Sequence, residues 1–174
     1  MVTPFELEAM LDSMVLLVDT REQNTPRLQR RLEDFGKPYR RQKLDFGDYS
    51  CEITGPNGET IDLSGRLCIE RKMNLDELCN CFCNGRQRFE REFQRAKEAG
   101  AKVYLLVESA TWEKVFGGVY RSRMKPDALI ASILAWTARY SIIPVFCKAE
   151  TTGRMIAKIL RYEVKSMIER GECV

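Results

Sequence analysis

Glu70-Arg71-Lys72-Met73-Asn74-Leu75-Asp76 is the stretch in which a strand pattern gives way to a helical pattern. Side chains alternate between the two faces of a sheet, so Glu70 and Lys72 are expected on one face and Arg71 on the other. Upstream, Gly47-Asp48 supplies a second carboxylate that a chain reversal can bring to the same point. Two carboxylates beside a lysine form a site suited to a divalent cation and a phosphodiester.

Alternating strand and helix patterns precede this stretch. Thr3-Pro4-Phe5-Glu6 is a capping box that predicts a short helix to about Leu11. Thr25-Pro26 predicts the start of a second helix, which ends at Gly36. The patterns predict strands over residues 14–18, 38–44, 48–54 and 61–72, the last as one or two strands, and a turn over residues 55–58.

The same alternation continues toward the C-terminus. The sequence predicts a helical run over residues 75–100, strands over 103–107 and 142–146, and helices that begin at residue 125 and span 151–170. Strands alternating with helices predict an α/β sandwich around a central mixed sheet flanked by helices. The chain is expected to be a single domain over residues 1–174, with an N-terminal helical extension over 1–13.

Composition excludes some classes of protein and leaves others open. The 174 residues carry a net charge of only +3, so charge alone does not indicate a nucleic-acid-binding protein. The basic residues are nevertheless clustered, and such clusters are commonly solvated faces. They are Arg27, Arg30 and Arg31, then Lys37, Arg40, Arg41 and Lys43, then Arg86, Arg88, Arg91 and Arg95. No apolar run has membrane-spanning length, so no membrane partner is expected.

Seven cysteines without a preceding secretory signal predict reduced thiols and a cytoplasmic location, or a nuclear one in a eukaryote. The Cys79-Asn80-Cys81-Phe82-Cys83 run resembles a metal-binding sequence, but its spacing differs from Cys-x-x-Cys. The chain contains no histidine, which excludes a mixed Cys/His zinc site. The role of these three cysteines stays open.

The residue types of the candidate site suit phosphodiester hydrolysis. Asp48 and Glu70 are the expected metal ligands, and Lys72 would orient the attacking water or neutralise a phosphate oxygen. Asp76, one helical turn beyond the strand, would touch the metal or hold Lys72. Asp19 ends a buried strand, where open α/β sheets place their ligands, and is a third candidate ligand.

Four motifs together resemble the XPF/MUS81 (ERCC4-type) nuclease family over about residues 14–170. They are Val18-Asp19-Thr20-Arg21-Glu22, Gly47-Asp48-Tyr49, Glu70-Arg71-Lys72 with Asp76 four residues after Lys72, and Asn84-Gly85-Arg86. The resemblance implies a restriction-endonuclease-like three-layer sandwich. It also implies a Mg²⁺- or Mn²⁺-dependent endonuclease that acts on branched or flapped DNA, and a homodimer.

The resemblance also implies roles for individual residues. The family's acidic and lysine active-site positions correspond to Asp19, Glu22, Asp48, Glu70, Lys72 and Asp76. Its motif arginines correspond to Arg21 and Arg71, which suit phosphate contact or positioning. Arg86 and Arg88, on the helix that follows, are candidate contacts to the DNA backbone.

The family resemblance also bears on the domain organisation, on an alternative function and on the last predicted helix. A stand-alone nuclease domain of prokaryotic or phage origin is expected, without the helix-hairpin-helix repeats that many relatives append. The alternative function is a catalytically silent scaffold that binds DNA or a partner, as some subunits of the family do. The apolar stripe of the helix over 151–170 suits either dimer pairing or ordinary core packing.

Overall fold

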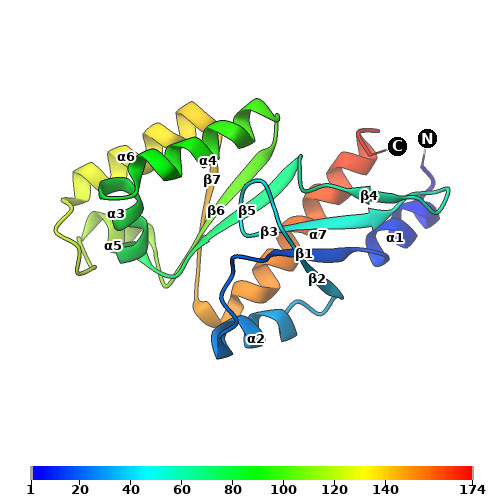
Figure 1. Cartoon of the computed structure of the whole chain (residues 1–174), viewed down its shortest axis with the longest axis horizontal. Helices are drawn as coiled ribbons and strands as arrows, with labels where there is room; N and C mark the ends of the chain where they lie inside the picture. The colour runs from blue at the N-terminus through cyan, green and yellow to red at the C-terminus, as the bar shows by residue number, and fades with distance from the viewer. Residues whose placement is uncertain (1, 174) are drawn as a thin grey trace.

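The structure is a computed structural model that describes residues 2–173. Seven strands form one mixed sheet with the order β2-β1-β3-β5-β6-β7, and β4 lies beside β3. Figure 1 shows this sheet running through the middle of the molecule. The strands are β1 (Val15–Asp19), β2 (Tyr39–Gln42), β3 (Tyr49–Thr54), β4 (Thr60–Asp62), β5 (Leu67–Lys72), β6 (Lys102–Glu108) and β7 (Ile143–Cys147).

Strand directions bring three chain segments to one end of the sheet. β1 runs antiparallel to β3, and β3 runs antiparallel to β5, so the end of β1, the start of β3 and the end of β5 are neighbours. The backbone N–H of Asp19 donates to the carbonyl of Asp48, whose own N–H donates to the carbonyl of Ile69, both at 2.9 Å. β6 and β7 continue the sheet in parallel with β5.

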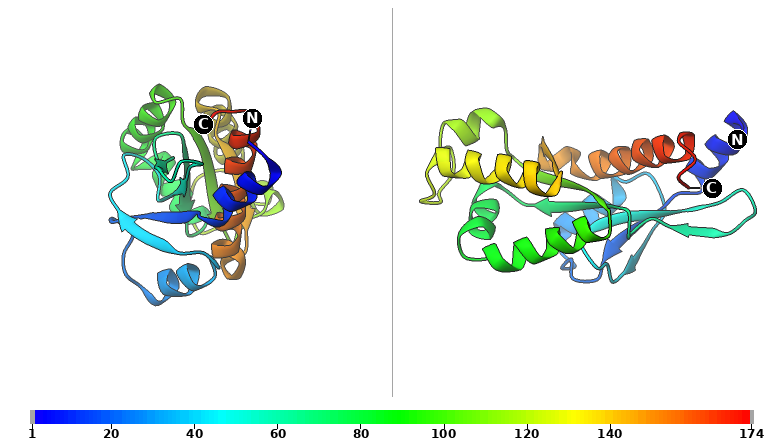
Figure 2. Two further views of the ribbon diagram at one scale, coloured as in Figure 1. Left: turned by 90° about the vertical axis from the view of Figure 1, so that its right-hand side faces the viewer. Right: turned by 90° about the horizontal axis from the view of Figure 1, so that it is seen from above.

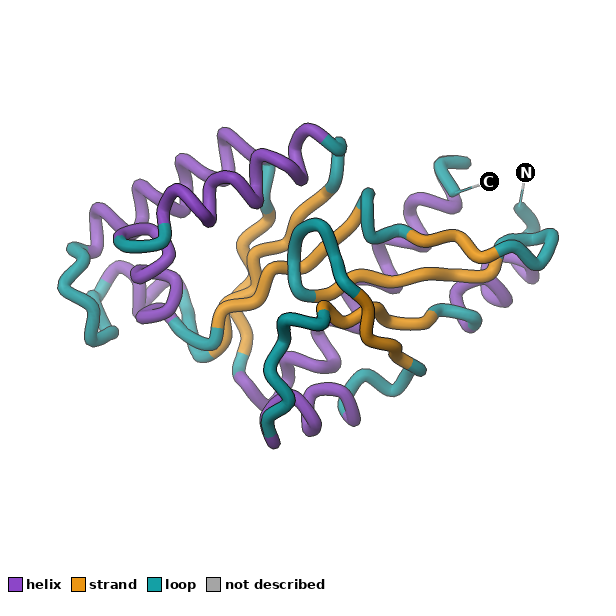
Figure 3. The backbone as a smooth tube through the Cα atoms, in the orientation of Figure 1, coloured by secondary structure: helices purple, strands orange, loops and turns teal. Residues whose placement is uncertain are grey.

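Helices cover both faces of the sheet, which gives three layers and confirms the predicted fold class. One face carries α1 (Pro4–Asp12), α2 (Pro26–Glu33) and α7 (Thr152–Glu169), and the other carries α3 (Leu75–Cys83), α4 (Arg86–Glu98), α5 (Trp112–Phe116) and α6 (Pro126–Tyr140). A single 3₁₀ turn, η1 (Ala149–Thr151), precedes α7. The right-hand view of Figure 2 shows the sheet between green α4 and orange-red α7, and Figure 3 shows the same layering by element type.

Local sequence signals explain several of the helix ends. Thr3 Oγ1 accepts a hydrogen bond from the Glu6 N–H, and the Glu6 carboxylate accepts one from the Thr3 N–H, which confirms the capping box. Thr25 caps α2 in the same way, through the Leu28 N–H. After α2, Gly36 adopts a φ of +61°, a conformation that few other residues tolerate.

The prediction of one helical run over residues 75–100 is wrong in detail. The run is two helices, because the N–H groups of Asn84 and Gly85 both donate to the carbonyl of Asn80 and end α3. The chain then turns, and α4 packs Phe89 and Phe93 around Trp136 of α6, with ring centroids 4.8 and 5.1 Å away. The five-residue α5 was not predicted from the sequence.

The apolar stripe of α7 belongs to the core. Ordinary core packing accounts for five of its members, which are buried against the sheet, α1 and α2: Ile156, Leu160, Val164, Met167 and Ile168. None of the helices in the described part of the chain is both long and apolar enough to cross a membrane.

Candidate active site

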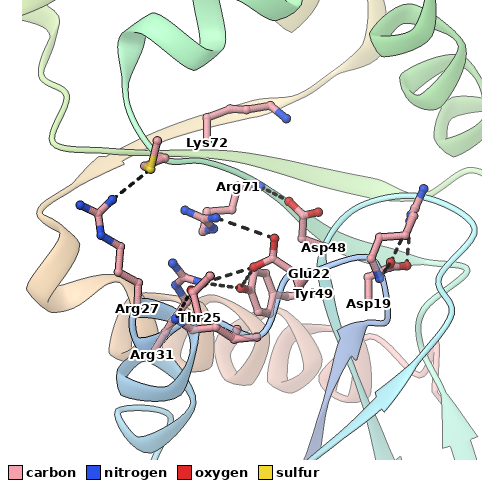
Figure 4. Close-up of polar contacts among 12 residues, drawn as sticks. Asp19, Glu22, Thr25, Arg27, Arg31, Asp48, Tyr49, Arg71 and Lys72 are labelled. Carbon is pink, nitrogen blue, oxygen red and sulfur yellow. Dashed lines mark hydrogen bonds and ion pairs between the residues drawn. The ribbon is translucent and has the colours of Figure 1, made fainter.

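The candidate site straddles the end of β5, with side chains on both faces of the sheet. Glu70 and Lys72 point to the α3/α4 face, and Arg71 points to the α2 face, as strand alternation predicts. In Figure 4 the side chain of Lys72 extends away from that of Arg71. Asp48 lies between the two sets, and its Oδ2 accepts a 2.7 Å hydrogen bond from the backbone N–H of Arg71.

A hollow of about 340 Å³ lies on the α3/α4 face and contains Asp48, Glu70 and Lys72. The Nζ of Lys72 donates to Oε1 of Glu70 at 2.5 Å and lies 4.9 Å from the centroid of the Phe89 ring. Burial disfavours the charged amine, but attraction to Glu70 and Asp48 raises the pKa of Lys72, so this lysine stays protonated. It can therefore act as a fixed cation and hydrogen-bond donor.

Five carboxylates line this hollow, those of Glu22, Asp48, Glu70, Glu77 and Glu92, and that of Glu70 is incompletely satisfied. Glu70 is 5% exposed, and its Oε2 has no hydrogen-bond partner among the described residues. Burial and the charge of Glu70 raise the pKa of Asp48 well above its usual range. Burial also raises the pKa of Glu70, although Lys72 opposes the shift. An orphaned buried oxygen beside a second carboxylate is a site that a cation would stabilise.

On the α2 face, Glu22 and Arg71 belong to a buried ionic network. Oε2 of Glu22 accepts hydrogen bonds from the Tyr49 hydroxyl at 2.6 Å and from Arg31 at 3.2 Å. Arg71 lies 3.7 Å from Glu22 and 3.4 Å from Glu108, and Arg31 lies 3.3 Å from Glu108. Two arginines thus balance two glutamates, which fixes the directions of Glu22 and Arg71 (Figure 4).

The structure places Asp19 outside the hollow, contrary to its expected role as a metal ligand. Its carboxylate accepts hydrogen bonds from the backbone and side chain of Arg21 and from the backbone N–H of Leu44. Burial opposes ionisation, but these bonds lower the pKa of Asp19. Both oxygens are committed, so Asp19 anchors Arg21 and the approach to β3. Arg21 itself lines the hollow.

Asp76 does not hold Lys72, which is a second correction. Its Oδ1 accepts the backbone N–H groups of Arg121 and Ser122, both at 2.7 Å, and its Oδ2 lies 3.5 Å from the Arg121 side chain. A slight burial is outweighed by these bonds, which lower the pKa of Asp76. The first turn of α3 therefore directs this carboxylate toward the loop before α6.

The helix α4 contributes residues on the open side of the hollow. Arg86 and Arg88 are both exposed, and Arg88 lines the hollow, where a DNA backbone contact is feasible. Sequence reasoning missed Glu92, whose Oε1 accepts a 3.0 Å hydrogen bond from the Gly47 N–H. The sequence did contain a sign of Glu92, because this residue is four positions after Arg88 and lies on the same face of the helix. Cys81 also lines the hollow.

The other missed residues are Arg31 and Glu108 of the ionic network. Glu108 ends β6, and β6 is parallel to β5, so their final residues lie side by side. The sequence did contain a sign of Glu108, because it is a charged residue at the end of a buried strand. Arg31 carried no comparable signal, because it belongs to a cluster of arginines on α2 that resembles a solvated face.

The donor set fits a hard divalent cation with few protein ligands. No three Asp, Glu or Cys side chains between residues 2 and 173 converge closely enough to hold a metal by themselves. Mg²⁺ is commonly held by one or two carboxylates and keeps several waters and substrate oxygens. Asp48 and Glu70, with the free Oε2 of Glu70, meet that requirement. The Cys79, Cys81 and Cys83 thiols are free, and no zinc cluster forms from them.

Comparisons with known proteins identify the family and the fold. The sequence profile of the ERCC4 domain matches residues 18–159. Two solved structures of XPF from Aeropyrum pernix are similar in fold. One has a TM-score of 0.61 at 23% identity, over 86% of this chain and 61% of that one. The other, a complex with DNA, has a TM-score of 0.62 at 22% identity, over 87% of this chain and 66% of that one. No curated protein sequence matches the chain.

Proposed function

The chain belongs to the ERCC4 domain family, and from this premise we propose that it is a metal-dependent DNA endonuclease that hydrolyses phosphodiester bonds. Its substrates would be branched, flap or fork DNA, and its cofactor Mg²⁺ or Mn²⁺. The main supporting observation is the buried Oε2 of Glu70 beside Asp48, which has no hydrogen-bond partner among residues 2–173, with Lys72 bonded to Glu70 in the same hollow.

The proposed roles follow from the contacts of these side chains. Asp48 and Glu70 would hold the cation, which when bound polarises the scissile phosphate and activates water. Lys72 is protonated and buried, so it neutralises a phosphate oxygen or orients the attacking water rather than taking a proton. Asp48 keeps its direction through the Arg71 N–H. The ionic network around Glu22 holds Arg71, and with it the end of β5.

The test is a cleavage assay on labelled flap, fork, splayed-arm and plain duplex DNA, with Mg²⁺ or with EDTA. We expect cleavage that requires the metal. Asp48→Asn and Lys72→Met should each lower the rate by about 100-fold or more, because each removes charge stabilisation at the reacting phosphate. Lys102→Met is the matched control, since Lys102 starts β6 at the opposite end of the sheet.

Two outcomes would contradict the proposal in different ways. Equal rates for the wild type and Lys72→Met would show that the hollow is not the active site. DNA binding without cleavage in any metal would instead support the scaffold alternative.

The substrate and assembly are parts of the same proposal. The chain spans 61% and 66% of the two solved XPF chains that it resembles. One of those chains is described as a complex with DNA, which supports DNA as the partner here. Repair or recombination of branched DNA is the process that such an activity would serve. The homodimer stays a prediction, which light scattering tests as a molar mass of twice 20.1 kDa.

A further inference from the structure

A depression lined by arginines and carboxylates adjoins the catalytic hollow on the α2 face, and its acidic residues are Glu22, Asp34, Glu77, Glu108 and Glu150. A space of about 740 Å³ shares Arg21 and Glu22 with the catalytic hollow. It also shares Arg27, Arg30, Arg31 and Met73 with a second space of about 610 Å³. Because neighbouring spaces share lining residues, they form one depression that leads away from the site. We call it the arginine groove, defined by Arg27, Arg30 and Met73.

Two of the positive charges in the arginine groove are not neutralised. Neither Arg27 nor Arg30 has a carboxylate within 4.0 Å in the described chain, whereas Arg31 and Arg71 are balanced by glutamates. Arg27 and Arg30 are exposed and stand three residues apart on α2, so they lie on the same face of the helix. Like charges at this spacing repel each other, and an anionic ligand would relieve the repulsion.

The chemistry of the arginine groove favours a sugar–phosphate backbone. Arg27 is held in place by Met73, with its guanidinium nitrogen 3.0 Å from the sulfur (Figure 4). Among the described residues that line the groove there is no aromatic side chain on which a base could stack. Contacts there would be made to phosphates, independent of sequence.

The groove also lies on the side of the site opposite to α4. Arg88 lines the catalytic hollow from the α3/α4 face, whereas Arg27 and Arg30 extend from α2 on the other face of the sheet. Basic residues therefore flank the catalytic hollow on both faces. A DNA that diverges into two arms at the scissile phosphate would meet one basic surface with each arm.

We propose that the arginine groove binds the backbone of one DNA arm that leaves the catalytic hollow, with Arg27 and Arg30 each on a phosphate. The inference rests on the proposed function, because it gives the path of the same substrate. It assigns a binding role to arginines that the sequence alone leaves as a solvated face.

The test is fluorescence anisotropy with a labelled fork DNA in EDTA, over about 50 to 200 mM salt. We compare the wild type with the double variant Arg27→Ala/Arg30→Ala. Each lost phosphate contact makes the slope of log K against log[salt] shallower by about 0.7 for a single strand and about 0.9 for duplex. The expected change for two lost contacts is therefore about 1.4 for a single strand and about 1.8 for duplex. Melting curves check that the double variant and the control variants are folded.

Two control variants separate local charge from other effects. Arg66→Ala/Arg170→Ala removes the same net charge from exposed residues near the start of β5, at the opposite end of the sheet, and should leave the slope unchanged. Arg27→Lys/Arg30→Lys keeps both charges and should keep the wild-type slope. A shallower slope in the lysine variant would mean that the slope depends on the packing of Arg27 on Met73 and not on contacts with phosphates.

The outcomes distinguish this inference from the proposed function. If the wild type cuts fork DNA and Arg27→Ala/Arg30→Ala keeps the wild-type slope, the arginine groove is not the binding surface. If the wild type neither binds nor cuts any of the DNAs, the proposed function fails, and the assigned DNA path fails with it.

Discussion

Arg71 and Lys72 are consecutive in the chain, yet they serve opposite faces of the sheet. Lys72 reaches Glu70 in the catalytic hollow, whereas Arg71 joins Glu22 and Glu108 in the ionic network. The two-residue period of a strand causes this division. Burial lowers the pKa of each cation, but the carboxylates beside it outweigh this effect and raise the pKa of both Arg71 and Lys72.

The raised pKa of Asp48 predicts an unusual pH dependence of stability. Between the unfolded-state pKa, about 4, and the raised folded-state pKa, the folded protein holds a proton that the unfolded chain releases. The free energy of unfolding should therefore fall as the pH rises through this window, without metal. Urea unfolding at several pH values measures it. Asp48→Asn lacks this contribution, and an identical pH dependence in both proteins would contradict the prediction.

The contacts of Asp76 predict a structural effect for its replacement. Asp76→Ala removes the acceptor of two backbone N–H groups, at Arg121 and Ser122, and should lower the free energy of unfolding by about 1–2 kcal/mol. Asp76→Asn keeps an acceptor and should cost less. Urea unfolding gives both values. Loss of the Mg²⁺-induced stabilisation in a folded Asp76→Asn protein would return Asp76 to the metal site.

At the scale of elements, the packing of α2 on α7 decides where Arg31 lies. A Cβ at Gly153, in the first turn of α7, would collide with the Arg31 carbonyl and approach the Asp34 Cβ to 2.7 Å. The helices are therefore in contact through backbone atoms at this point. Because α2 also carries Arg27 and Arg30, the packing of α2 on α7 determines the position of the arginine groove as well.

Gly153→Ala should push α2 away from α7. We expect a loss of about 1–3 kcal/mol in the free energy of unfolding, the usual cost of overpacking. Gly65→Ala is the matched control, because nothing lies within 4 Å of its added Cβ, and it should stay within about 0.5 kcal/mol of the wild type. Urea unfolding measures both. Equal stabilities would show that the two helices can separate without cost.

At the scale of the whole molecule, a metal that binds only the folded state should raise the melting temperature. At 100 times its Kd the ion adds about 2.7 kcal/mol, which for a domain of this size is a rise of about 5–11 °C. Glu70→Gln should lose most of the rise. Asp19→Asn should keep it, because Asp19 is bonded to Arg21 and Leu44. Scanning calorimetry at neutral pH, with Mg²⁺ or EDTA, measures the shift, and a melting temperature indifferent to millimolar Mg²⁺ would count against the site.

The sequence by itself determined the elements that depend on local signals. The capping box at Thr3, the strand that ends in Glu70-Arg71-Lys72 and the division of its side chains between two faces follow from backbone periodicity and capping chemistry. The family motifs located Asp48, Glu70 and Lys72, which the structure brings to one hollow. Each of these signals lies within a few consecutive residues of the chain.

Only the tertiary structure decided what the remaining polar groups contact. Asp19 turns to Arg21 and Leu44, Asp76 reaches a loop 45 residues away, and Arg31 meets Glu108 across 77 residues. A buried charge must find a partner wherever the fold supplies one, and sequence spacing does not reveal which partner that is. The break between α3 and α4 is also a matter of tertiary packing, because it lets Phe89 and Phe93 pack on Trp136 of α6.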